Sequence, residues 1–212
     1  MRQKVACLAL AAGVALVSAP LRAEGPAFDC AKADGDVEKL ICQDDGLASL
    51  DRKLDEVYKA ALAKARDDVP RSLKAEQRGW IKGRNECWKA QGTENPVFLT
   101  ASWQATSVRG CVEGQYQIRI SELQALFQLV PAKGPVFYAC EDNPANEVVA
   151  TFFETEPPTA RLERGDRTVT AWLVPAGSGS KYEGQNVEFW SKGDEATVTW
   201  LDEKLTCRTS KR

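Results

Sequence analysis

The feature that most constrains this chain is a change in the spacing of its apolar residues near position 131. Before that position, apolar side chains recur every three or four residues, which is the repeat of an amphipathic helix. From Val136 on they alternate with polar residues, which is the repeat of a β-strand. The segment Pro131-Ala-Lys-Gly-Pro135 lies between the two patterns, and its prolines interrupt both. The chain is therefore expected to join a helical half to a β half.

The helical half is expected to contain three long helices and a short one. The apolar stripe of residues 44–65 predicts an amphipathic helix, and a second helix is expected to follow Pro70, a favourable first-turn residue. A third helix is expected to run from about residue 113 to residue 127, and residues 35–42 suit one or two turns. Residues 91–110 read as a long loop, which is unusual in a compact domain and suggests a function or a disulfide clamp.

The β half contains six stretches with the alternation of strands, separated by turn-forming residues. They are residues 136–140, 147–153, 167–174, 186–191, 196–201 and 204–208. Six or more strands in so short a segment indicate a small antiparallel barrel or sandwich. The predicted fold class is therefore α+β as two domains, a small disulfide-bonded helical domain followed by a small antiparallel β-barrel.

The first 23 residues have the pattern of a secretory signal peptide. Two basic residues precede an apolar stretch over residues 5–17, which is too short to span a bilayer, and Ala23 offers a small residue for cleavage. Cys7 lies inside the apolar stretch and only three residues from Lys4, with no apolar run before it. We therefore expect cleavage after Ala23 and a soluble periplasmic protein that is not a lipoprotein.

The division into domains limits how the cysteines are expected to pair. The expected segments are a signal peptide at 1–23, a helical domain at 24–130, a linker at 131–135 and a β-barrel domain at 136–212. Six cysteines remain after the signal peptide, and an even number in an exported chain points to disulfides. Two domains with four and two cysteines reduce the possible pairings. We predict the disulfides Cys30–Cys42, Cys87–Cys111 and Cys140–Cys207.

Composition excludes several functional classes. The chain contains no histidine, which rules out Ser-His-Asp and Cys-His catalysis and the common zinc sites. We expect no catalytic residue, no metal and no cofactor. The chain has 28 basic and 30 acidic residues, and the signal peptide removes three of the basic ones, so the mature net charge is −5. A chain with this net charge lacks the excess of basic residues that binds nucleic acid or anionic lipid, and it favours a cationic partner.

The β half carries several motifs in a fixed order. They are Tyr138-x-Cys140, Ser178-Gly179-x-x-Tyr182, the run FWSKGDEA at 189–196, and Cys207. In these motifs the half resembles the inhibitors of c-type lysozyme, the family that includes the membrane-bound lysozyme inhibitor and its periplasmic relatives. The resemblance implies a small antiparallel β-barrel whose partner is c-type lysozyme, a cationic protein.

The same resemblance implies which residues bind the partner. The serine of one motif and the lysine of the other enter the lysozyme cleft in that family, and these positions are Ser178 and Lys192 here. Gly179, Tyr182 and Gly193 complete the expected lysozyme-binding residues. Taken alone, a serine between two glycines is usually a turn former and a lysine at a hairpin tip is usually solvated surface. The ring of Tyr182 suits packing, with its hydroxyl supporting the loop, and core is the default for Trp190.

The helical half carries a second set of motifs. They are Glu38-x-x-Ile41-Cys42, Leu47-x-x-Leu50-Asp51 with Tyr58 beyond, and Gln77-Arg78-x-Trp80-x-x-x-Arg84-x-x-Cys87. In these it resembles the N-terminal domain of LprI-type lysozyme inhibitors, a small disulfide-bonded helical family. No residue-level site comes with this resemblance. Trp80 and Arg84 lie one turn apart, and a stack that supports the helix pair is favoured over a binding patch.

Together these features predict a periplasmic inhibitor of c-type lysozyme. It would plug the active-site cleft with a serine loop and a lysine hairpin, protect the bacterial cell wall, and perform no chemistry itself. The competing class is a periplasmic binding or scaffold module that acts through the helical domain. A glycosidase with paired carboxylates is a third class, which no spacing in the sequence supports. The oligomeric state and any ligand of the helical domain stay open.

Overall fold

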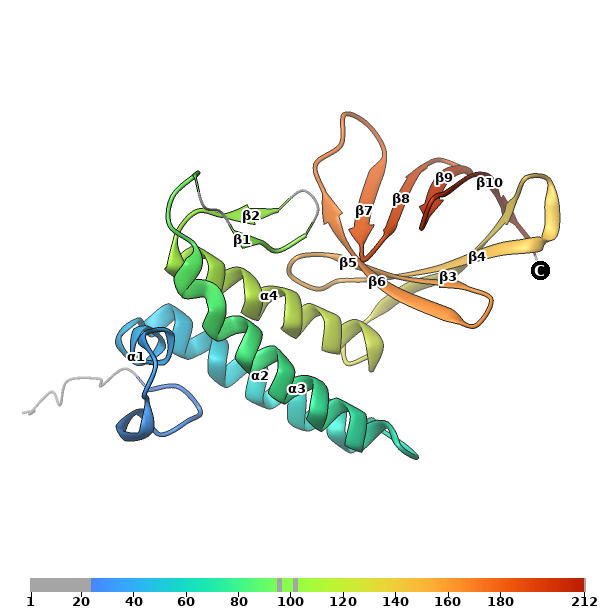
Figure 1. Cartoon of the computed structure of the whole chain (residues 1–212). Helices are drawn as coiled ribbons and strands as arrows, with labels where there is room; N and C mark the ends of the chain where they lie inside the picture. The colour runs from blue at the N-terminus through green and yellow to red at the C-terminus, as the bar shows by residue number, and fades with distance from the viewer. Residues whose placement is uncertain (1–23, 95–96, 101–102, 212) are drawn as a thin grey trace, which may run out of the picture.

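The computed structural model describes residues 24–94, 97–100 and 103–211 and shows a helical domain followed by a closed antiparallel β-barrel (Figure 1). The α+β organisation predicted from the change in apolar spacing is thus confirmed. The expected signal peptide, with its cleavage position and Cys7, lies outside the described residues. Within the described part of the chain, none of the helices has the length and apolar character needed to cross a membrane.

Two of the long helices begin at a residue whose side chain caps the first backbone N–H groups. The elements are η1 (Cys30–Lys32), α1 (Asp36–Gln43), α2 (Asp45–Lys64), α3 (Val69–Asn85), η2 (Glu86–Lys89) and α4 (Val108–Leu126). The carboxylate of Asp44 caps α2 by accepting from the Leu47 N–H at 2.9 Å, and Pro70 lies in the first turn of α3. The hydroxyl of Ser107 accepts from the Gly110 N–H at 3.1 Å, so α4 begins five residues before the expected start.

The segment expected as a long loop, residues 91–110, contains secondary structure. β1 (Val97–Phe98) and β2 (Gln104–Ala105) pair as a short hairpin that lies beside α4 (Figure 1), and the first residues of α4 also belong to this segment. Gly114 of α4 is buried beneath the hairpin, and a Cβ there would collide with the side chain of Leu99. The hairpin is therefore packed onto α4 at a glycine.

The core of the helical domain is centred on α4. Its buried side chains include those of Val112, Tyr116 and Leu123, which pack against residues of α1, α2 and α3. Two disulfides close this domain, Cys30–Cys42 between η1 and α1 and Cys87–Cys111 between η2 and α4. They are the two pairs predicted for the helical half.

Eight strands form the barrel. They are β3 (Ala132–Cys140), β4 (Asn143–Phe153), β5 (Thr159–Arg164), β6 (Arg167–Val174), β7 (Ser180–Gly184), β8 (Val187–Lys192), β9 (Glu195–Trp200) and β10 (Glu203–Ser210). Each strand pairs antiparallel with its neighbour in sequence, and β10 pairs with β3. β5 and β7 are additional to the six strand candidates of the sequence.

The segment expected as a linker, residues 131–135, belongs mostly to β3. Ala132 pairs with Phe153 of β4, and the register shifts between Lys133 and Val136. This irregularity accommodates Pro135, because proline in a sheet is tolerated where a ladder hydrogen bond is already missing. The helical domain and the barrel are thus joined almost directly.

The barrel interior is filled by inward-facing residues of all its strands. Phe189, Leu162, Val148, Val198 and Leu205 are among the most deeply buried. The disulfide Cys140–Cys207 joins residues that lie directly opposite each other on β3 and β10, which are the first and last strands. It therefore fastens the barrel where the chain closes on itself.

The two domains meet where α4 faces β5 and β6 (Figure 1). The indole Nε1 of Trp172 on β6 donates to the buried hydroxyl of Ser121 on α4 at 2.9 Å. After α4 ends, the ammonium group of Lys64 holds the chain by donating to the carbonyl oxygens of Phe127 and Gln128. These contacts fix the barrel beside the C-terminal half of α4.

Candidate functional site

Ser178 and Lys192 lie at the same end of the barrel because of the pairing of β7 with β8. Ser180, the first residue of β7, pairs with Ser191 near the end of β8. The serine loop (residues 175–179) therefore leads into β7 at the same edge where β8 ends in the lysine turn (residues 192–195). Ser178 and Lys192 are both exposed there. The pairing of β7 with β8 thus brings Ser178 and Lys192, which are fourteen positions apart in the sequence, to the same edge of the barrel.

The serine loop rests directly on the end of β8. Gly179 has φ +70°, and a Cβ at this position would overlap the carbonyl oxygen of Ser191 and lie 3.2 Å from the Cβ of Lys192. The indole Nε1 of Trp190 donates to the carbonyl oxygen of Ser178 at 2.8 Å. A glycine is thus required both for the left-handed backbone and for the close approach. The contact brings the serine loop and the lysine turn together as one projection.

Trp190 was expected in the core, and the structure corrects this interpretation. Its ring is half-buried on the outer face of the barrel, because Phe189 occupies the inward position of the alternation. Its bond to the Ser178 carbonyl makes it a support of the serine loop. The alternation from the buried Phe189 was the signal in the sequence that could have indicated this.

The lysine turn presents the ammonium group of Lys192 at its exposed start. Gly193 has φ +59° in the two-residue connection between Lys192 and Glu195. Asp194 is held by Thr209 of β10, which donates its N–H to the Asp194 carbonyl at 2.9 Å, and Glu195 accepts from Arg208 at 2.8 Å. Among the described residues, no carboxylate forms an ion pair with Lys192. Its ammonium group therefore remains available to a partner.

A depression of about 560 Å³ opens into the barrel beside this projection. Ser180 and Ser191 line one side of it, and Tyr182 lies deeper, with only 8% of its surface exposed. The Tyr182 ring packs against Phe152, with ring centroids 5.5 Å apart, and against Phe189 at 6.4 Å. Burial raises the pKa of Tyr182, so its hydroxyl stays protonated at neutral pH. Tyr182 thus packs below the loop, while Ser178, Gly179, Lys192 and Gly193 are exposed.

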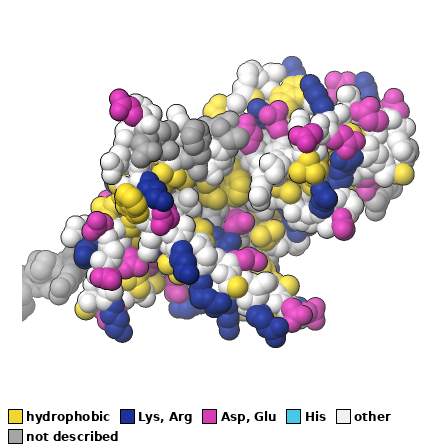
Figure 2. Space-filling model, in the orientation of Figure 1, with side chains coloured by type: hydrophobic (Ala, Val, Ile, Leu, Met, Phe, Trp, Pro, Cys, Tyr) yellow, Lys and Arg dark blue, Asp and Glu magenta, His cyan; other side chains and the backbone are white. Residues whose placement is uncertain are grey.

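Charges around the barrel are mixed. Figure 2 shows acidic and basic side chains interspersed over the visible face of the barrel, without a large region of one sign. Lys181 is enclosed by two acidic partners, at 3.1 Å from Glu183 and 2.9 Å from Glu188. Its hydrogen bond to Glu188 is the main cause of its raised pKa. The ammonium group of Lys181 is therefore occupied by ion pairs on the barrel wall, whereas Lys192 forms no ion pair with a described residue.

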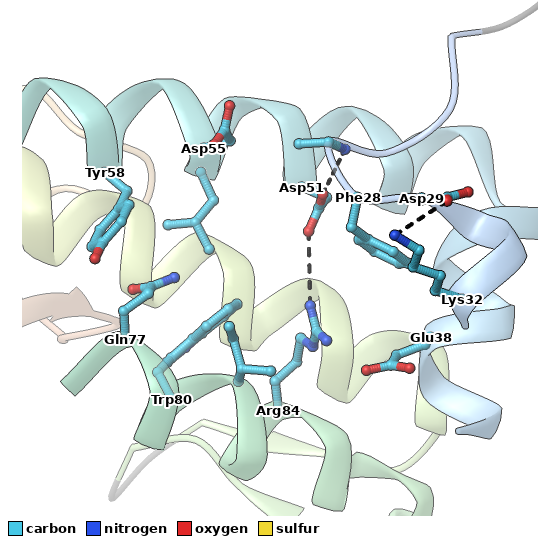
Figure 3. Close-up of a pocket in the computed structure, with 13 residues that line it drawn as sticks. Phe28, Asp29, Lys32, Glu38, Asp51, Asp55, Tyr58, Gln77, Trp80 and Arg84 are labelled. Carbon is cyan, nitrogen blue, oxygen red and sulfur yellow. Dashed lines mark hydrogen bonds and ion pairs between the residues drawn. The ribbon is translucent and has the colours of Figure 1, made fainter. Parts of the chain in front are cut away.

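The helical domain has a hollow of its own, of about 540 Å³, between α2, α3 and the N-terminal segment (Figure 3). Arg84 is buried at its floor, where its Nη1 donates to the Tyr116 hydroxyl at 2.7 Å. That hydroxyl donates to Asp51 Oδ1 at 2.7 Å, and Arg84 Nη1 lies 3.7 Å from the same oxygen. The Arg84 guanidinium lies 5.5 Å from the centre of the Trp80 ring. The predicted aromatic–arginine stack is therefore present, and its arginine also takes part in the hydrogen-bond network with Tyr116 and Asp51.

The described residues offer no arrangement of His, Cys, Asp or Glu that could hold a metal ion. Ser178 and Lys192 present an exposed hydroxyl and an exposed ammonium group at the barrel end, which can bind anionic or polar groups. The carboxylate of Glu195 accepts from Arg208 at 2.8 Å and that of Asp194 accepts from the Thr209 hydroxyl at 3.3 Å, so both acidic side chains of the turn have partners on β10. The arrangement suits recognition of a partner that carries carboxylates.

Comparison with known families agrees with both halves. Residues 138–206 match the family described as membrane-bound lysozyme-inhibitor of c-type lysozyme, and residues 30–123 match the family described as lysozyme inhibitor LprI. Proteins named Lipoprotein LprI from Mycobacterium bovis and from two strains of Mycobacterium tuberculosis are each 32% identical over 191 residues. These alignments cover 88% of this chain and 85% of each relative. The chain therefore belongs to the LprI family of lysozyme inhibitors, and its barrel matches the family of c-type lysozyme inhibitors.

Proposed function

We propose that this protein inhibits c-type lysozyme by placing the serine loop and the lysine turn in the active-site cleft of the enzyme. The observation that carries the proposal is the close packing of Gly179 against Ser191 and Lys192. This contact joins the serine loop and the lysine turn into one exposed projection. Membership in two lysozyme-inhibitor families supports the same partner.

The chemistry of the projection suits the chemistry of lysozyme. Lysozyme cleaves glycosidic bonds with two carboxyl groups, a protonated acid in an apolar environment and an ionised partner. The Lys192 ammonium can pair with the ionised group, and the Ser178 hydroxyl can hydrogen-bond the other in either protonation state. The net charge of −5 after loss of the signal peptide favours encounter with a cationic enzyme. The protein blocks the partner's reaction and performs none.

The test is titration of the purified protein into a cell-wall lysis assay with c-type lysozyme. A fall in lysis that saturates with added protein is the expected result. An unchanged rate of lysis would instead favour a binding module that acts through the helical domain, for which the hollow between α2 and α3 is the supporting observation. Lysis without added lysozyme would indicate a glycosidase.

We further propose that the mature protein begins at Glu24 in the periplasm, has no lipid anchor, and folds as a helical domain at 24–130 and a barrel domain that begins with β3 at Ala132. The mycobacterial relatives are named lipoproteins, which makes the anchor a point for direct measurement. The intact mass of protein purified from the producing cell should correspond to cleavage after Ala23. A lipid-modified species that retains Cys7 would contradict this proposal.

Ser178→Ala is expected to weaken inhibition by about two- to tenfold. The substitution removes one hydrogen bond, which typically contributes about 0.5–1.5 kcal/mol. The inhibition constant of each variant is the measurement. Ser72→Ala, in which an exposed hydroxyl of α3 is removed, should leave the constant unchanged. Equal effects of the two variants would count against a role of Ser178.

Gly179→Ala is expected to weaken inhibition although both Ser178 and Lys192 are retained. A side chain there would be strained at φ +70° and would push the loop off the Ser191 carbonyl, at a cost of about 1–3 kcal/mol. Gly177→Ala is the matched control, because it lies in the same loop with nothing within 4 Å of the added Cβ. If both variants inhibit alike, the packing of the serine loop against β8 is not needed for inhibition.

A further inference from the structure

The barrel end that carries the serine loop is also the end to which the helical domain is attached. β3 enters the barrel at Ala132, a few residues after the end of α4. The serine loop follows Val174, two residues beyond Trp172, whose indole is bonded to Ser121 of α4. A partner seated on the serine loop therefore approaches the helical domain as well.

The surface between these two regions is hollowed. A second depression, of about 420 Å³, lies at the domain junction, between α2, α4 and the loop that connects β4 to β5. It shares Glu154 and Thr155 of that loop with the depression at the barrel mouth. The two hollows therefore adjoin at these residues, and we call them together the junction groove. The groove runs from Ser180 and Ser191, beside the proposed projection, to Gln117 and Gln124 of α4.

The size of the projection shows that a stable complex needs more surface than the loop and the turn supply. The serine loop contributes five residues and the lysine turn four. A stable protein–protein interface buries about 800 Å² on each partner and uses roughly 20–30 residues a side. Most of the interface must therefore come from neighbouring surface. The junction groove is concave surface that adjoins the projection on the side of the helical domain.

We propose that c-type lysozyme seats on both domains, with the junction groove as the second part of its binding surface. This inference rests on the proposed function and extends it to the helical domain. The half-buried amides of Gln117 and Gln124 form no hydrogen bond with other described side chains, so they can bind the partner's backbone. Glu156 adds an exposed carboxylate at the groove, which suits a cationic protein, while the Glu154 carboxylate is paired with Lys133 at 2.8 Å.

The first experiment places a cation in the helical wall of the groove. Gln117→Arg in the full chain should raise the inhibition constant for c-type lysozyme by about tenfold or more, because like charges at an interface are strongly unfavourable. Gln115→Arg is the matched control, since Gln115 is a half-buried glutamine of the same helix that does not line the groove. It should stay within about twofold of the unmodified protein, within which surface substitutions typically fall.

The second experiment looks for tighter binding, which misfolding cannot imitate. Lys53 on α2 lines the groove and carries the same sign of charge as the partner. Lys53→Gln should strengthen inhibition by about two- to fivefold at low salt, and the gain should shrink as salt is added. Lys74→Gln makes the same charge change at an exposed position of α3 away from the groove and should give no such gain.

Lys192→Ala, measured in parallel, separates failure of this inference from failure of the proposed function. If the unmodified protein does not inhibit lysozyme, the proposed function falls and the inference falls with it. If Lys192→Ala weakens inhibition while Gln117→Arg matches Gln115→Arg and Lys53→Gln matches Lys74→Gln, the barrel alone holds lysozyme. That result overturns the two-domain surface and leaves the proposed function standing.

Discussion

Lys192→Ala is expected to weaken inhibition of c-type lysozyme by about 30-fold or more. In the proposed complex its ammonium group pairs with a catalytic carboxylate in a cleft that the barrel closes to water. Removal of one partner of such a pair typically costs about 2–5 kcal/mol, and each 1.4 kcal/mol is about tenfold in affinity. Because Lys192 is exposed and forms no ion pair with a described residue, the melting temperature should barely change. The inhibition constant and the melting curve together are the measurement.

The control must remove the same charge without disturbing the barrel. Lys181 is close in sequence but unsuitable, because its loss would strip a cation from Glu183, of which only 5% is exposed. Lys204 is exposed on β10 near the turn that joins β9 to β10, and Lys204→Ala therefore changes only net charge. If Lys204→Ala weakens inhibition as much as Lys192→Ala, long-range attraction explains the effect and the active-site plug is wrong.

Periodicity predicted the fold class well because each half has a clear repeat. It missed β7, where Tyr182 is the single apolar side chain of Ser180–Gly184 and the outward Glu183 is nevertheless buried. It also placed a linker at residues 131–135, where pairing of Ala132 with Phe153 extends β3. Both misses depend on partners distant in sequence, which a local pattern of residues does not contain.

The candidate site, like the fold, could be predicted from the sequence only in part. The motifs around Ser178 and Lys192 were readable in the sequence through their resemblance to a family of inhibitors. Their closeness in space follows from the Ser180–Ser191 pairing and the left-handed Gly179, neither of which local spacing specifies. The continuation of the site toward α4 depends on how the domains meet, for which the sequence contained no signal.

Arg84→Met is expected to destabilise the helical domain by about 3–5 kcal/mol. Arg84 is 4% exposed, donates to the Tyr116 hydroxyl and lies 3.7 Å from Asp51 Oδ1, so its removal leaves a largely buried carboxylate without its cation. Breaking a buried ion pair in this way is strongly destabilising. Burial also raises the pKa of Tyr116, so its hydroxyl remains a neutral donor and cannot replace the lost charge. Denaturant unfolding followed by circular dichroism is the measurement.

Arg78→Met is the matched control, since Arg78 is exposed on the same helix and forms no ion pair with a described residue. It should shift the unfolding free energy by no more than about 0.5 kcal/mol, as surface substitutions usually do. A large loss for Arg84→Met alone identifies the network below the α2–α3 hollow as structural support. If both variants unfold alike, the network does not hold the helices together. The buried arginine would then have to be explained by a ligand of the hollow, which would favour the helical domain as a binding module.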